Sequence, residues 1–189
     1  MANQDSAFGL RAIGKIGQNR DAQGLSEYSI AASATAIYQG DPVKALNTGT
    51  IGVAAAGDVL LGSLNGIFYT DPSTQKPTWA NHLAASNAAT DIVGYVSDDP
   101  YERFEIQSNN TGASTQTDVF MNYDIAYAAG SSPNFVSKVE LDYATGVSST
   151  NQLRVIGVSK DPSNNELASA NTNYVVEIVE HFYKQAAGI

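Results

Sequence analysis

The chain has 189 residues, 43% of them apolar, and a formal net charge of −9 from 19 acidic and 10 basic side chains. This length and apolar fraction suffice for one folded domain with its own core, and the lack of cysteine excludes disulfides and thiolate chemistry. The acidic balance argues against binding to a nucleic-acid backbone. No apolar run is long enough to span a membrane and no secretory leader pattern is present, so we expect no membrane partner and no Sec export.

Residues 1–25 are expected to form an extended arm. Apolar Phe8, Leu10, Ile13 and Ile16 are separated by glycines and form no helical stripe. A segment of this kind cannot close a core by itself. Two alternatives remain open from the residues alone: a frayed terminus, or an arm that becomes ordered when it docks on a partner.

Within this arm, the stretch GLRAIGKI differs by one residue from the phosphate-binding pattern G-x-x-x-x-G-K-[ST]. The pattern works because a buried strand leads into a glycine turn and a helix, and its final hydroxyl binds Mg²⁺. Ile16 cannot ligate a metal, no buried strand precedes Gly9, and no apolar helical stripe follows. We therefore expect no nucleotide site here, and the likeness to the pattern is accidental.

From residue 26 onward the chain is predicted to form many short strands. Runs rich in Val, Ile and Tyr end at Gly, Asn or Pro about every ten residues, and four of the six prolines follow an aspartate that favours a type I turn. The expected strand-bearing segments are residues 27–38, 43–47, 51–58, 59–70, 91–100, 103–108, 137–143, 152–162 and 172–183.

This pattern predicts one all-β domain over residues 26–189, a small antiparallel β-barrel or sandwich preceded by the arm. The sequence does not distinguish a tulip-like from a jelly-roll-like topology. Residues 78–89 fit either a short helix or a loop, and residues 117–128 are ambiguous.

No catalytic constellation is evident. His82 lies in a polar loop, and we interpret His181 as a half-exposed packing residue on a terminal strand. Asp98, Asp99 and Glu102 could supply oxygen ligands to Ca²⁺, but they lack EF-hand spacing and fit an exposed turn and strand face better. We therefore expect no enzymatic activity, no cofactor and no metal, with these three carboxylates as the candidate ligands to check.

Five segments resemble, in the same order, the head decoration (capsid cement) proteins of podovirus-like and marine tailed phages. They are AFGLRAIGKI, IYQGDPVKAL, IGVAAAGDVLLGSLNGIFY, YVSDDPYERFEIQSNNTG and LRVIGVSKDPSNNELASANTNYVVEIVEHFY. The stretches PTWANHLAASNAATD and FMNYDIAYAAGSSPNF match only loosely. The resemblance implies a compact β body on the outer capsid surface of the virion, a homotrimer at local three-fold positions, made in the host cytoplasm.

The resemblance also implies that each copy bridges subunits of the major capsid protein and stabilises the expanded shell. An acidic body fits this place, because packaged DNA would repel it from the inside. The expected capsid-contacting residues of the arm are Phe8, Leu10, Arg11, Ile13, Lys15, Ile16 and Arg20. The alternative is a tail or receptor-binding β module, for which Trp79 and Tyr101 would have to be exposed aromatic contacts.

Overall fold

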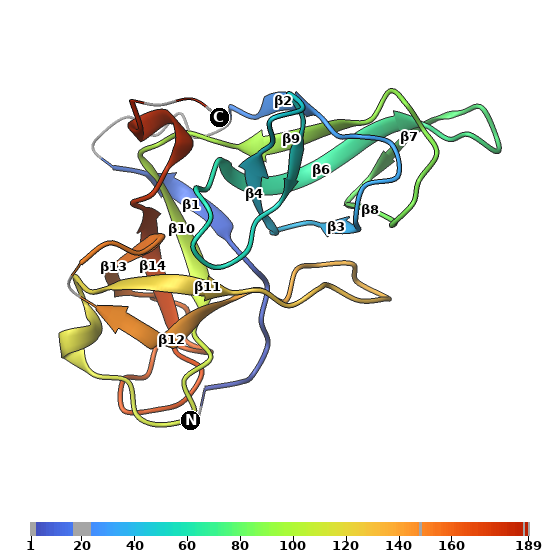
Figure 1. The fold of residues 1–189 in the computed structure, drawn as a ribbon. Coiled ribbons are helices and arrows are strands. Elements are labelled where there is room, and N and C mark those ends of the chain that lie inside the picture. Colours follow the sequence, from blue (N-terminus) through green and yellow to red (C-terminus); the bar gives the residue numbers. More distant parts are fainter. Residues whose placement is uncertain (1–2, 17–23, 148, 187, 189) are drawn as a thin grey trace.

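The computed structural model describes residues 3–16, 24–147, 149–186 and 188. The fold is all-β, as predicted, with two antiparallel six-stranded sheets and a two-stranded ribbon (Figure 1). Sheet A contains, in spatial order, β1 (Arg11–Lys15), β10 (Glu102–Gln107), β14 (Asn173–Ile178), β13 (Leu153–Val158), β11 (Asn122–Ala126) and β12 (Glu140–Val147). Sheet B contains β2 (Ser26–Ser29), β9 (Val93–Ser97), β6 (Gly62–Thr70), β4 (Pro42–Ala45) and β5 (Ile51–Val53), with β7 (Pro77–Ala80) paired to β6.

The two ambiguous regions are resolved as strands and turns. Residues 78–89 include most of β7 and the short strand β8 (His82–Leu83), which pairs with β3 (Ile37–Tyr38). Residues 117–128 include β11 and the end of the turn η1 (Gln116–Asp118). Among the described residues, the helical elements are η1 and a second single 3₁₀ turn, η2 (Phe182–Lys184).

Sheet A curls around its own core but does not close into a barrel. A single bridge between Ser108 and Leu141 brings β12 back toward the end of β10, and the Asn109 amide donates to the Leu141 carbonyl at 3.1 Å. Alternate residues of each strand point inward, as the two-residue period of a strand requires. The buried cluster inside is Leu10, Ala54, Leu60, Phe104, Ile106, Tyr123, Ile125, Val139, Leu141, Leu153, Val155, Tyr174, Val176 and Ile178.

Sheet B has a separate core on one face. Its buried cluster is Ile30, Ile37, Val43, Ile51, Leu61, Leu64, Ile67, Leu83, Ala89, Ile92 and Val96. The expected barrel or sandwich is therefore realised as two β layers that each bury their own apolar cluster. Segments that cross from one sheet to the other must hold the layers together.

One such segment is the N-terminal strap, defined as residues 3–16. The Asn3 side chain donates to the Ala170 carbonyl at 2.9 Å, and Gln4 and Asn164 exchange hydrogen bonds of 2.9 and 2.7 Å. Farther along, β1 pairs with β10 as the edge strand of sheet A. The predicted arm is thus extended but lies along its own chain over the described residues, because a segment too poor to close a core can still complete an existing sheet.

The strap joins the two sheets at Leu10. Its side chain is 1% exposed in the core of sheet A, while its amide donates to the Gly40 carbonyl at 2.8 Å. The Ser63 hydroxyl of β6 in turn donates to the Leu10 carbonyl at 2.6 Å. One residue therefore connects the core of sheet A to the backbone of sheet B.

The long β11–β12 connection reaches the same place from the other side. Figure 1 shows this segment, in orange, extending beneath β3. Val136 forms a bridge with Gln39, and the Ser137 amide donates to the Gln39 carbonyl at 2.8 Å. We call the meeting point of residues 8–10, 39–41 and 136–137 the junction.

Gly9→Ala should destabilise the fold strongly. Gly9 has φ +75°, and an added Cβ would lie 2.2 Å from the Gly40 carbonyl oxygen and 2.6 Å from the Ser137 Cβ. Strain and displacement of backbone atoms predict a loss of about 3 kcal/mol in the free energy of unfolding, measured by urea denaturation. Gly112→Ala is the matched control, since no atom lies within 4 Å of its added Cβ; equal effects of the two changes would contradict this account.

Candidate interaction surfaces

Two basic residues of the strap, Arg11 and Lys15, form ion pairs with acidic side chains of the same chain. The Arg11 guanidinium pairs with the Glu105 carboxylate and lies 4.5 Å from the centre of the Phe8 ring. Lys15 Nζ lies 2.7 Å from a carboxylate oxygen of Asp99. Arg11 and Lys15, both expected to contact the capsid, therefore already have intramolecular partners, and the Arg11 side chain is still 52% exposed.

The ion pair of Arg11 has a buried carboxylate, Glu105, as its acidic partner. Its side chain is 6% exposed, and it also accepts a hydrogen bond from the Ser159 hydroxyl. The Asn173 side-chain amide donates to the same oxygen at 3.5 Å. A buried carboxylate needs such partners, so Arg11 stabilises the fold in addition to any contact that it makes outside.

The apolar residues of the strap divide into two groups. Leu10 is buried in the core and is not available to a partner, whereas Ile13 is 49% exposed and Ile16 is 39% exposed. The Ile16 amide donates to the Tyr101 carbonyl at 3.0 Å. Tyr101, which is 60% exposed, therefore lies beside the end of the strap. Arg20, also predicted to contact a partner, lies outside the described residues.

The three candidate metal ligands do not converge on one point. Asp98 accepts hydrogen bonds from Ser26 and Tyr28, Asp99 pairs with Lys15, and Glu102 is 3% exposed. Burial raises the pKa of Glu102. In the described part of the chain, no group of three or more His, Cys, Asp or Glu residues could hold a metal ion.

Both histidines are packing residues. The His82 ring stacks on Phe135 with centroids 3.9 Å apart, and burial lowers the pKa of His82. His181 is fully buried, not half-exposed as expected, and its Nδ1 accepts from the Tyr183 amide at 3.1 Å. Burial, followed by the nearby charge of Lys184, lowers the pKa of His181 to about 4.

A buried carboxyl lies at the junction. Asp41 is fully buried, and its Oδ2 accepts from the Tyr38 amide at 2.9 Å. Its Oδ1 has no hydrogen bond of good geometry among the described residues. Burial raises the pKa of Asp41 to about 6, and the weaker influences of Ser137 and Tyr38 in the opposite direction do not offset it.

Asp41→Asn should change how stability depends on pH. Because the folded-state pKa lies above the ordinary value of 3.8, the folded protein binds this proton more tightly, and stability is lost as pH rises from about 4 to 6. The variant should gain about 3 kcal/mol relative to the wild type between pH 4 and pH 7, measured by urea denaturation at each pH. The lowered pKa of His181 acts in the opposite direction, because the protein loses stability as pH falls from 6.5 toward 4. The variant keeps this effect without that of Asp41, so its free energy of unfolding should decrease on acidification. A constant difference between the two proteins at all pH values would contradict the burial of a titrating Asp41.

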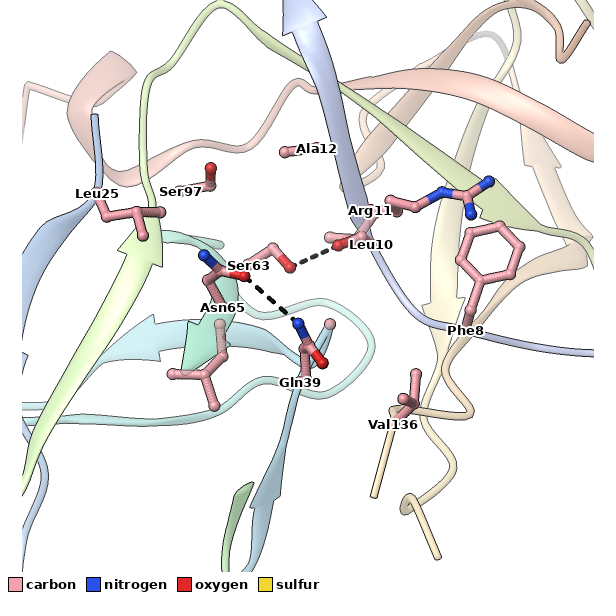
Figure 2. A pocket seen from close by; sticks show the side chains of 12 residues that line it. Phe8, Leu10, Arg11, Ala12, Leu25, Gln39, Ser63, Asn65, Ser97 and Val136 are labelled. Carbon is pink, nitrogen blue, oxygen red and sulfur yellow. Dashed lines mark hydrogen bonds between the residues drawn. The ribbon is translucent and has the colours of Figure 1, made fainter. Parts of the chain in front are cut away.

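A crevice of about 440 Å³ lies between β1 and sheet B (Figure 2). Its accessible apolar side chains are Phe8, Leu25 and Val136, while Leu10 and Leu64 also line it but are buried in the cores of sheets A and B. Gln39, Asn65 and Ser97 contribute polar groups from the side of sheet B, and Arg11 is the one charged residue of the lining. The Gln39 and Asn65 amides meet at 3.5 Å, a weak contact that leaves both groups able to turn toward a ligand.

A second surface, the aromatic face, lies on the side of sheet B opposite to its core. It consists of Phe68, Trp79 and Tyr95. Phe68 and Trp79 are opposite one another and are 38% and 56% exposed, and the Trp79 and Tyr95 rings are 4.9 Å apart between centroids. The Trp79 ring covers Gly66, where an added Cβ would lie 2.5 Å from the indole.

The aromatic face is poor in charge. Strand register places Glu27 opposite Tyr95, and the other residues of β2, β6, β7 and β9 around these rings are Ser29, Gly66, Phe68, Thr70, Pro77, Trp79 and Val93, all uncharged. Lys44 of β4 lies on the same side of the sheet and is paired with Asp58. In a chain of net charge −9, such a region is an exception. Exposed aromatic groups with few charges are typical of the centres of protein interfaces.

Sequence reasoning found only part of these surfaces. Trp79 and Tyr101 were flagged as possible exposed aromatic contacts, and both are exposed. Phe68 and Tyr95 were missed, although the strand alternation around them was a usable signal. The crevice had no signal in the sequence, since its lining comes from six separate segments of the chain.

No protein-family model, curated protein or solved structure matches this chain. Within the described residues, no helix has both the length and the apolar character needed to cross a membrane. The fold and the surfaces described above are therefore the basis for a functional proposal.

Proposed function

We propose that this chain is a virion structural protein that decorates the outer surface of a tailed-phage capsid and stabilises the expanded shell by bridging subunits of the major capsid protein. The ordered resemblance of five segments to capsid decoration proteins supports this proposal. The net charge of −9 also supports it, because packaged DNA would repel such a body from the inside of the shell.

The aromatic face is the observation that carries the proposal. It presents three aromatic side chains from β6, β7 and β9 on a regular sheet, with one charged neighbour, Glu27. A free monomer would normally place polar side chains on the solvated face of an antiparallel sheet. We assign this face to contacts between copies of the chain in a homotrimer.

The strap end supplies a different surface for the shell. Ile13, Ile16 and Tyr101 are exposed there on backbone that is fixed to the body by hydrogen bonds. A trimer would present three such ends at once, so weak individual contacts would gain from effective concentration. Only the expanded shell would offer all three sites at the correct spacing, and internal pressure would then have to break these contacts as well.

The exposure of Trp79 also favours a second candidate, a tail or receptor-binding module of the particle. An indole that lies flat on the sheet with 56% of its surface free could bind a ligand ring. The two roles differ in abundance, since a shell lattice requires hundreds of copies and a tail only a few.

The copy number in purified particles should be near one per major capsid subunit. Quantitative mass spectrometry against the major capsid protein measures this ratio. A handful of copies would move the chain to the tail or portal, and its absence from particles would overturn the virion assignment.

Trp79→Ser should weaken self-association. Because Trp79 is the only tryptophan, its emission should also shift to shorter wavelength as wild-type protein is concentrated and the ring leaves water. Sedimentation velocity should show the wild type as a trimer and the variant shifted toward monomer. Tyr101→Ser, which removes an equally exposed ring outside the aromatic face, should leave the mass unchanged. A wild-type monomer at all concentrations would rule out the assignment of this face.

A further inference from the structure

The outer edge of β1 has backbone groups that point into the crevice. In a strand the N–H and C=O of successive residues point alternately to the two sides. The backbone N–H and C=O of Leu10 point toward sheet B, because the amide donates to the Gly40 carbonyl and the carbonyl accepts from the Ser63 hydroxyl. Arg11 is paired with Glu105 of β10. The N–H and C=O of Ala12 therefore point away from β10, toward the crevice that Ala12 lines.

The direction of β10 agrees with this alternation. The Ser108 amide donates to the Thr172 carbonyl, on the β14 side. Because the direction alternates from residue to residue, the backbone groups of Ile106 and Phe104 also point to β14. The backbone groups of Glu105 point to β1. Arg11 and Glu105 are thus a hydrogen-bonded pair, and Ala12, opposite Phe104, is left with an outward-facing amide and carbonyl.

Only a slender ligand can reach this edge. The crevice is bounded by β1 on one side and by Asn65 and Ser97 of sheet B on the other (Figure 2). A folded edge strand of a second copy would carry its own body into this space, where sheet B already stands. A single extended segment fits, because it can use the backbone groups of Ala12 and place one side chain between the walls.

The lining also selects the chemistry of that side chain. Phe8, Leu25 and Val136 provide apolar side chains, and the one charged group of the lining, Arg11, is already held by Glu105 and by the Phe8 ring. A charged side chain would lose water without gaining an unpaired opposite charge. A volume of about 440 Å³ has room for an apolar side chain together with part of an extended backbone.

We propose that the crevice binds an extended segment of a capsid subunit, which adds as a short strand to β1 at Ala12 and inserts an apolar side chain into the crevice. This inference rests on the proposed role in the capsid and specifies how the shell is recognised. Backbone hydrogen bonds supply affinity in such strand addition, and the side-chain pocket supplies specificity.

Ala12→Pro tests the backbone bond directly. Proline removes the outward amide, and it is tolerated at a sheet edge whose N–H faces solvent. Empty expanded shells assembled from the major capsid protein are the probe, and binding is measured by co-sedimentation. We expect at least about tenfold weaker binding for Ala12→Pro, while Ala12→Ser, which keeps the amide, binds like the wild type. Equal binding of a folded Ala12→Pro variant would overturn strand addition.

Hydrogen exchange of the wild-type protein provides a second test that needs no variant. On shell binding, the peptide that contains residues 11–13 should become protected. Unchanged exchange in shell-bound protein would contradict the inference. Protection that rises with protein concentration in the absence of shells would assign the edge to a second copy. A wild-type protein that fails to bind shells at all would instead contradict the proposed function.

Discussion

The connection at Leu10 is the constraint on which the rest of the structure depends. Its side chain completes the core of sheet A, and its amide and carbonyl are bound to Gly40 and Ser63 on the side of sheet B. The approach is close enough to require glycine at position 9 and at position 40, where an added Cβ would lie 2.6 Å from the Phe8 carbonyl oxygen. Since each sheet buries its own cluster, a few such crossings determine how the two sheets are oriented.

This constraint also organises the candidate surfaces. The crevice exists because the strap crosses from sheet A to sheet B and leaves a gap beside β1. Pairing with β10 fixes the outward direction of Ala12, and the junction fixes the distance to the opposite wall. The aromatic face consists of other residues of sheet B, on β6, β7 and β9, with Tyr95 opposite Gly66 and two positions from Ser97 of the crevice. A trimer contact and a shell contact can therefore coexist without competing for the same residues.

The sequence predicted the fold class because its signals were local. Strand runs and Asp-Pro turns act within a few residues. The all-β fold confirms the strands, and turns follow Asp71, Asp99 and Asp161, whereas Pro42 after Asp41 is the first residue of β4. The strap was judged in isolation, so its burial of Leu10 and its pairing with β10 could not be foreseen. Arg11 shows the same limit, because its partner Glu105 is distant in sequence. The crevice is harder still, since its existence depends on how two sheets pack.

The most direct test of this account is hydrogen exchange at the Leu10 amide, followed by NMR in the free protein. If the strap is an integral part of the fold, this amide should exchange only through global unfolding, as slowly as amides at the centre of β14. Exchange at the rate of a frayed terminus, with β14 still protected, would show that the strap opens independently. That result would contradict the central role of the junction and return residues 3–16 to the status of a separate arm.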